Sequence, residues 1–160
     1  MILKPDLLKM PQKEFATTEK VLYAFPENKL DFIPHERSQN AKRLISTFIF
    51  EMFLVKIYAF GENLNRTIFK DYNPENLEDF ISDFKKNSSD IISGLRDLPD
   101  EKLSTIVEFA GAKFQAAEFI LMMLHDQIHH RGQLTVYIRL AGGKVPSVYG
   151  PSADDSSTNF

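Results

Sequence analysis

The chain has 160 residues, of which 43% are hydrophobic and 26% charged, a composition typical of one globular domain with its own core. The formal net charge of −3 argues against nucleic acid as the main partner, and the absence of cysteine excludes disulfides and a thiol nucleophile. No apolar run approaches the ~20 residues that a membrane span needs, so we expect a cytoplasmic protein with no membrane partner.

The first part of the chain predicts two helices joined by a proline-containing loop. Residues 1–11 should form a lead-in arm, and Pro11 suits the first turn of an amphipathic helix that ends near Phe25. Ser38 is expected to cap a second helix, which runs to about Phe60.

The second part predicts a crossover and two further helices. Residues 63–76 form a connection that is too long for a tight turn, and Pro74 opens a third helix that ends near Leu95. Apolar and polar residues alternate over 103–110, which indicates a short extended segment. A fourth helix is expected over 114–141. Four helices with one long crossover connection predict an all-α four-helix bundle.

The C-terminal region is expected to divide into a packed part and a loose part. Residues 1–152 should form the single domain, with Val145, Val148 and Tyr149 packed back on the bundle. Residues 153–160 are mostly polar, so we expect a flexible tail.

The predicted last helix carries three of the four histidines beside other polar groups. At about 100° per residue, one face combines apolar and polar side chains: Phe119, Met122, Met123, Asp126, His130, Gln133 and Tyr137. The polar members should therefore point into the bundle beside the second helix, where they need partners. A metal or a bound small molecule would supply them, and Gln133 and Tyr137 are expected to line its pocket.

Two interleaved pairs of metal ligands fit the spacing of this helix. His125 and His129 stand at i, i+4, and so do Asp126 and His130. A zinc-protease HExxH motif is excluded, because Asp and Gln follow His125. Spacing alone leaves open whether either pair binds metal or is hydrogen-bonded to neighbours.

The remaining charged candidates have simpler expected roles. Glu51 interrupts a very apolar part of the second helix, and we expect it to face solvent or another subunit, with a buried ligand or base as the alternative. His35 should be exposed. Arg131 and Arg139 are expected to be surface or interface cations, with carboxylate binding as the alternative.

The last helix is also apolar on the side opposite the histidine-bearing face. These residues are Ile120, Leu121, Leu124, Ile128 and Ile138. Either the extended segment and the N-terminal arm cover this side, or a second subunit does. We predict a symmetric homodimer.

The run HHRGQLTVYIRLAGGKVPSVYGPS resembles the C-terminal signature of the DinB-like (YfiT-like) superfamily, and FIPHERSQNAKRLIS is similar to the start of that family's second helix. The resemblance covers nearly the whole chain. It implies a four-helix bundle and points to a homodimer.

The resemblance also implies a divalent metal, zinc or nickel, held by three histidines. Carried over, those positions are His130, Asp126 and Thr47, so one of the three histidines is retained. Asp126 is still a metal ligand by chemistry, but Thr47 is a poor one. We therefore expect weak, exchangeable metal binding, or a polar pocket that holds water or a small anion.

The chemistry implied by the resemblance is metal-dependent hydrolysis or thiol-dependent transfer. The alternative is a non-catalytic bundle that has lost its metal and binds a small ligand or a partner protein.

Overall fold

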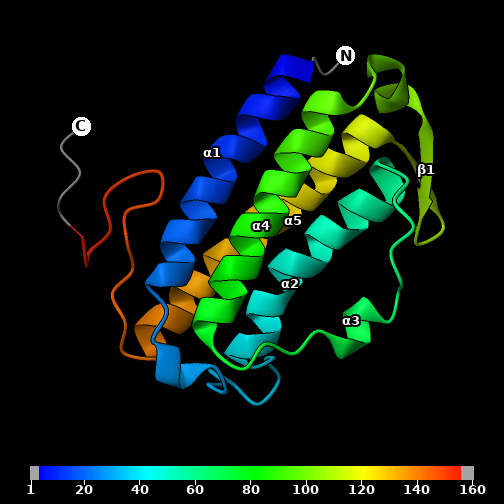
Figure 1. Cartoon of the computed structure of the whole chain (residues 1–160). Helices are drawn as coiled ribbons and strands as arrows, with labels where there is room; N and C mark the ends of the chain where they lie inside the picture. Colours follow the sequence, from blue (N-terminus) through cyan, green and yellow to red (C-terminus); the bar gives the residue numbers. More distant parts are fainter. Residues whose placement is uncertain (1–3, 156–160) are drawn as a thin grey trace.

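The structure, a computed structural model, describes residues 4–155 and consists mainly of four long helices packed side by side (Figure 1). The long helices are α1 (Lys4–Tyr23), α2 (Ala41–Leu54), α4 (Leu77–Asp97) and α5 (Ala116–Leu140). Helix α5 contacts α1 and α2, and α4 contacts the same two helices on the other side. Helices α2 and α4 run in one direction and α1 and α5 in the other. The predicted four-helix bundle with one long crossover is therefore confirmed.

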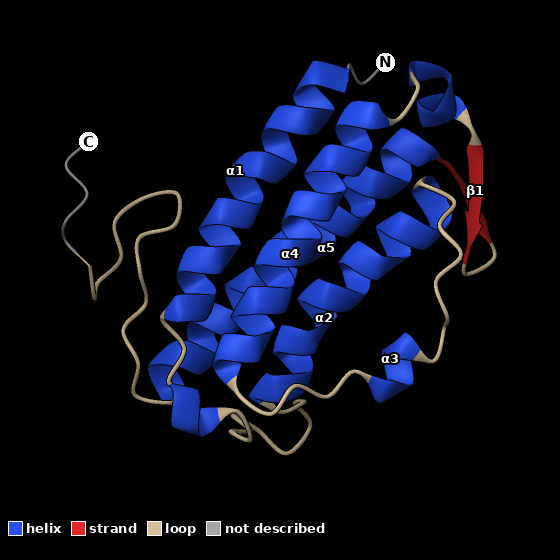
Figure 2. Cartoon of the chain, in the orientation of Figure 1, coloured by secondary structure: helices blue, strands red, loops and turns tan. Residues whose placement is uncertain are grey.

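Short elements fill the connections between the long helices (Figure 2). Helix α2 continues as one π-helical segment, Val55–Ala59, and the crossover to α4 contains the short helix α3 (Ile68–Asp71). Two 3-10 turns, Glu27–Lys29 and Asp100–Ser104, follow α1 and α4. An antiparallel hairpin of β1 (Ile106–Phe109) and β2 (Ala112–Gln115) then leads into α5.

The helix starts differ from those expected, because other residues cap the free backbone groups. Helix α1 begins at Lys4, so Pro11 lies inside it and not in its first turn. The α2 cap is Asn40, whose Oδ1 accepts from the Arg43 N–H at 2.9 Å, and not Ser38. Asn76 caps α4 in the same way, because its side chain accepts a backbone hydrogen bond, which a proline side chain at position 74 cannot do.

Part of the extended segment expected over 103–110 is one arm of the hairpin, β1, whereas Leu103 and Ser104 belong to the preceding 3-10 turn. Its turn places Ala110 at φ 51° and Gly111 at φ 81°, the left-handed conformation that a two-residue type I′ turn requires at both positions. The second strand occupies residues that the helical pattern assigned to the start of the last helix, so that helix begins at Ala116, with Gln115 and Glu118 forming its capping box.

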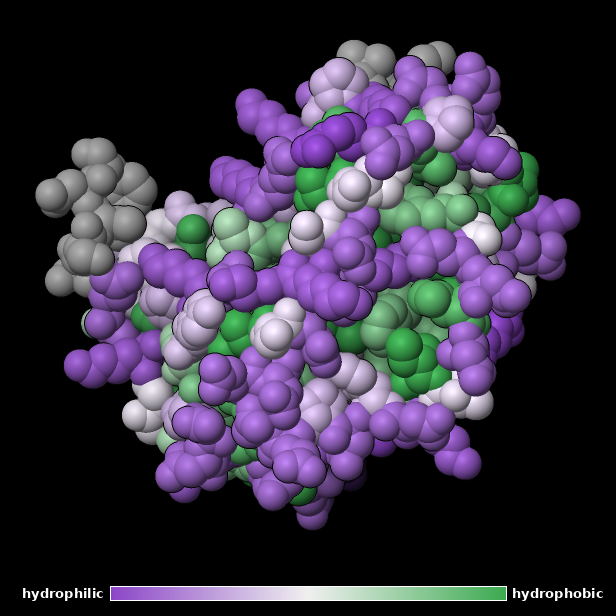
Figure 3. All heavy atoms as spheres, viewed as in Figure 1, coloured by the Kyte–Doolittle hydropathy of each residue, from purple (hydrophilic) through white to green (hydrophobic). Residues whose placement is uncertain are grey.

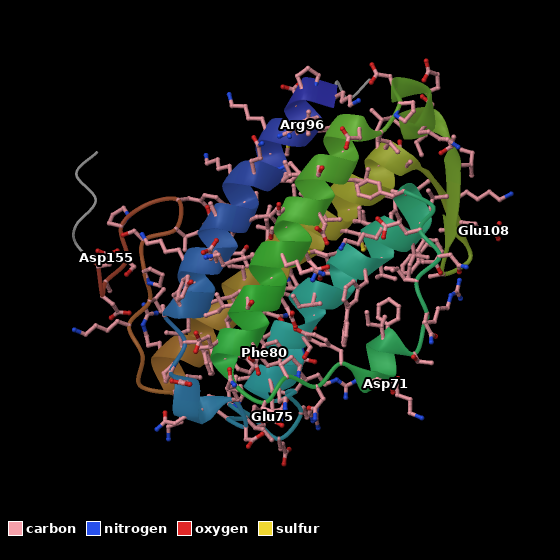
Figure 4. The ribbon with its side chains drawn as sticks, viewed as in Figure 1. Asp71, Glu75, Phe80, Arg96, Glu108 and Asp155 are labelled. Carbon is pink, nitrogen blue, oxygen red and sulfur yellow. The ribbon has the colours of Figure 1, made fainter. Side chains whose placement is uncertain are left out.

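Aromatic rings join three of the long helices in the core. The Phe84 ring of α4 contacts Phe15 of α1 and Phe48 of α2, with ring centroids 6.1 and 6.3 Å apart in edge-to-face geometry. Phe80, labelled in Figure 4, lies one turn earlier on α4 and is also buried. These contacts link α1, α2 and α4 and fix the spacing of those three helices.

The apolar residues on both sides of α5 are explained by its position between two helices. Ile120, Leu124 and Ile138 are buried in the core, while Leu121 and Ile128 are partly buried against it. Most of the apolar side chains that suggested a second subunit are thus buried or partly buried within one chain. The homodimer stays a prediction.

Arg131 is a buried cation and not a surface one, which corrects the expectation from sequence. Its guanidinium donates to the Glu14 carboxylate at 2.7 Å, to the Thr18 hydroxyl at 3.1 Å and to the Tyr149 hydroxyl. The Tyr149 hydroxyl in turn donates to Glu14 at 2.5 Å. This network joins α5, α1 and the C-terminal segment, so a charge can be buried there with its partners satisfied.

The C-terminal segment packs along α1, as the sequence predicts for its first part. Val145 is buried and Val148 partly buried against the core, whereas the Tyr149 ring is exposed and its hydroxyl is held by the network just described. Asp154, in the segment expected to be flexible, accepts from Arg139 at 2.9 Å. Residues 156–160 lie outside the described residues.

The face formed by α1 and α4 is mostly polar, and apolar atoms reach the surface near α3 (Figure 3). There, Phe50, Phe69 and Tyr72 are partly buried, and the Phe50 ring contacts each of the other two rings edge to face. Across residues 4–155, no helix combines the length and the apolar character that a membrane span requires.

Candidate metal centre

Three ligand-type side chains meet where α2 packs against α5. Glu51 comes from α2, and Asp126 and His130 come from successive turns of α5. His130 Nε2 lies 3.6 Å from Glu51 Oε1 and 3.6 Å from Asp126 Oδ1. One potential ligand atom from each residue lies within 4.8 Å of the others. Across the described residues, this is the one group of three or more such side chains close enough to hold a metal ion.

Glu51 is buried, which corrects the expectation that it faces solvent or another subunit. It is 2% exposed, and neither carboxylate oxygen has a hydrogen-bond partner within the described chain. A buried carboxylate without donors costs several kcal/mol, so this group needs either a proton or a cation.

Burial, and after it the neighbouring Asp126 carboxylate, together raise the pKa of Glu51 from 4.5 to about 10. Two ionised carboxylates can only accept hydrogen bonds, so the pair is satisfied only if one of them carries a proton. Without a cation, Glu51 is therefore protonated at neutral pH and can share its proton with Asp126.

The geometry of the three groups fits a divalent cation. At metal–ligand distances of about 2.1 Å, tetrahedral ligand atoms lie about 3.4 Å apart, close to the 3.6 Å separations of His130 Nε2 from the two carboxylates. These separations are too long for direct hydrogen bonds. Two carboxylates and one imidazole form a donor set that binds hard and borderline cations.

Gln133 holds the His130 ring in the orientation that a metal ligand needs. Gln133 Oε1 lies 3.0 Å from His130 Nδ1, and Gln133 Nε2 lies 2.9 Å from His129 Nε2. With the amide assigned this way, His130 Nδ1 carries the proton and donates it, which leaves the Nε2 lone pair facing the carboxylates. Hydrogen bonds of this kind fix the tautomer of metal-binding histidines.

The other predicted ligands lie outside this cluster. Thr47 precedes Glu51 by about one turn of α2, and its hydroxyl donates to the Arg43 carbonyl at 3.2 Å. His125 and His129 are exposed on α5. Among the site residues expected from sequence, the structure brings together Asp126 and His130, with Gln133 behind the imidazole.

A groove leads away from His130 between α5 and the loop of residues 30–40. The Tyr137 hydroxyl donates to the Gln39 carbonyl at 2.9 Å, and its ring contacts Phe32, so the loop is fastened to the helix. The groove has a volume of about 810 Å³. Its lining residues are Pro34, His35, Arg37, Ser38, Gln39, Arg43, His130, Gln133, Val136, Tyr137 and Leu140. Both residues expected to line a pocket, Gln133 and Tyr137, border this groove.

Glu51 is the site residue for which the sequence favoured an exposed role, with a buried ligand or base only as the alternative. Its signal was present, because it is the one acidic residue in the otherwise very apolar stretch from Leu44 to Phe60. An isolated carboxylate in such a helix indicates either a charged interface or a buried ligand, and the packing of α5 decides between them.

Comparison with known proteins agrees with the fold. A crystal structure of a DinB-like protein from Bacillus cereus is 23% identical, with a TM-score of 0.78, and the match covers 91% of this chain and 97% of that one. A DinB-like protein from Bacillus subtilis, YjoA, is 18% identical with a TM-score of 0.69, over 90% and 98% of the two chains.

Sequence comparison points to the same family. The uncharacterized protein YrdA of Bacillus subtilis is 31% identical over 88 residues, which are 54% of this chain and 53% of YrdA. The match thus spans about half the length of that relative. The model of the DinB family matches residues 3–159. The chain therefore belongs to the DinB family.

Proposed function

We propose that this protein is a divalent-metal-dependent hydrolase whose metal is held by Glu51, Asp126 and His130. The observation that supports this best is the Glu51 carboxylate, which is buried, has no hydrogen-bond donor and lies 3.6 Å from His130 Nε2. A cation at this position would satisfy both carboxylates at once. The third ligand comes from α2, as the resemblance implied, but from Glu51 in place of Thr47.

The donor set favours hydrolysis over thiol-dependent transfer. Carboxylate oxygens and an imidazole suit Zn²⁺ or Mn²⁺ acting on oxygen-containing substrates, because two oxygen ligands make the ion a harder Lewis acid that favours oxygen over a soft thiolate. Zinc is the first ion to test. Nickel, the other ion that the resemblance implied, serves as a comparison.

The side chains around the centre have separate roles in this proposal. A bound metal would supply Lewis acidity and lower the pKa of water at this end of the groove. Glu51 gives up its proton when the cation binds. The Asp126 side chain is 48% exposed, so protons can pass from this side of the centre to solvent. The groove places a substrate beside His130.

Calorimetric titration with Zn²⁺ tests the metal site. We expect one ion per chain in the wild type, and loss of this binding in Glu51→Gln, Asp126→Asn and His130→Ala. His125→Ala is the matched control on the same helix and should bind as the wild type does. Binding that survives Glu51→Gln but is lost in His125→Ala would assign the metal to His125 and His129 instead.

Activity is tested separately with ester, amide and phosphate-ester substrates, with zinc and after chelation. Turnover that requires zinc and disappears in Glu51→Gln is the expected result. Zinc bound at the three residues without turnover of any of these classes would contradict the hydrolase and favour the non-catalytic alternative.

Gln133→Leu should weaken zinc binding about 10- to 100-fold, the usual effect of removing the hydrogen bond that orients a histidine ligand. The ligand atoms themselves remain, so binding should weaken without being abolished. Competition with a chelating dye measures the affinity. Gln12→Leu, an exposed glutamine of α1, is the control. An unchanged affinity in Gln133→Leu would show that His130 is oriented by other contacts.

A further inference from the structure

The groove beside His130 is lined by cations on a chain that is acidic overall. Arg37 and Arg43 border it, and no aspartate or glutamate is among its lining residues. The chain as a whole carries a formal net charge of −3. The positive lining is therefore a local feature, because the average surface has the opposite sign.

The two arginines have no protein partner for their charge. Within the described residues, neither the Arg37 nor the Arg43 guanidinium makes an ion pair or a hydrogen bond, whereas their backbone N–H groups donate to the His35 and Asn40 side chains. By contrast, Arg131 and Arg139 are both paired with carboxylates. Guanidinium groups bind carboxylate and phosphate oxygens through paired hydrogen bonds.

An apolar strip runs along the other wall of the groove. Val136 and Leu140 stand one turn apart on α5, and both are exposed. Exposed apolar side chains beside unpaired cations give the groove one wall for the body of a ligand and one for its charge. His130 closes the end nearest the candidate metal centre.

We propose that the groove binds a small organic anion, with a carboxylate or phosphate group on Arg37 and Arg43 and an apolar body on Val136 and Leu140. This proposal rests on the hydrolase proposed above, since it names the substrate class of that site. The anionic group would anchor the substrate at one end of the groove while the bond to be cleaved lies beside His130.

The test uses full-length protein freed of metal with a chelator, so that anions cannot bind through a metal ion. Benzoate, phenyl phosphate and the neutral benzyl alcohol are titrated calorimetrically. At least one of the two anions should bind, with an affinity that falls as salt is raised, and benzyl alcohol should not. Which anion binds more tightly separates carboxylate from phosphate recognition.

Matched variants locate the binding. Arg37→Gln and Arg43→Gln should each lower the affinity for the anion by about tenfold, as expected for loss of one charge-assisted contact. Arg96→Gln is the control, because Arg96 lies at the C-terminal end of α4, at the opposite end of the bundle from the loop of residues 30–40 (Figure 4). Equal binding in all three variants, or benzyl alcohol binding as tightly as the anions, would overturn the proposal.

Zinc titration of the Arg37→Gln/Arg43→Gln double variant separates the two proposals. Normal zinc binding together with lost anion binding is the expected result. Zinc binding by the wild type without any anion binding would overturn the substrate class and leave the metal site standing. Anion binding at the arginines in a chain that binds no zinc would support the groove and contradict the hydrolase.

Discussion

Arg131→Ala should lower the free energy of unfolding by about 3–5 kcal/mol, the cost of removing one partner of a buried charge pair. Arg131 is 2% exposed, and its guanidinium lies 2.7 Å from the Glu14 carboxylate. The substitution leaves that carboxylate, 12% exposed, without its counter-charge. It also removes the guanidinium that donates to the Tyr149 hydroxyl, one of the contacts that tie the C-terminal segment to the bundle. Urea unfolding followed by circular dichroism measures the loss.

Arg139→Ala is the matched control for this experiment. Arg139 lies on the same helix and is also paired with a carboxylate, but its side chain is 55% exposed. Solvent screens such a pair, so its removal should change the unfolding midpoint far less. Equal losses in the two variants would mean that the Arg131 network contributes no more than a surface ion pair.

Glu51→Gln should stabilise the metal-free protein at neutral and alkaline pH, although it removes metal binding. In the unfolded chain Glu51 ionises near its ordinary pKa of 4.5, whereas burial and Asp126 raise its pKa in the folded protein to about 10. Between these values folding takes up a proton. The stability of the wild type should therefore fall with rising pH across this window, by at most about 1.4 kcal/mol per pH unit.

The comparison between variants isolates the contribution of Glu51. Glutamine does not titrate, so the advantage of Glu51→Gln should be absent below pH 4.5 and grow as the pH rises toward 9. Unfolding in urea, with a chelator present throughout, measures it at each pH. Glu62→Gln, an exposed glutamate, should follow the wild type. Parallel pH profiles for the wild type and Glu51→Gln would show that Glu51 is ionised in the folded state.

The bundle could be predicted from the sequence because the helices carry long apolar stripes and the crossover is too long for a turn. The rotation of α5 about its own axis could be predicted less well than the bundle. Apolar residues occur on two sides of this helix, since it packs against both α1 and α2, and the period then fits several rotations. Asp126 and Gln133, which were predicted to point inward, lie at the edge of the buried face of α5. The buried face itself contains Gln127, Arg131 and Leu134.

The roles of Glu51 and Arg131 depend on contacts between residues far apart in the chain. Arg131 can be buried because Glu14 and Thr18 of α1 meet it. Glu51 becomes part of the candidate metal centre because Asp126 and His130 of α5 lie opposite it. Local spacing identified Asp126 and His130 as an i, i+4 pair, but it holds no information about which residue of the second helix completes the group.

The central claim, that Glu51, Asp126 and His130 hold one metal ion, is tested most directly by anomalous scattering from crystals grown with zinc. Data collected on both sides of the zinc absorption edge locate the ion without reference to the protein atoms. The account predicts one strong anomalous peak between α2 and α5, about 2.0–2.2 Å from an oxygen of each carboxylate and from His130 Nε2. A peak at His125 and His129, or crystals saturated with zinc that show no peak beside Glu51, would contradict it.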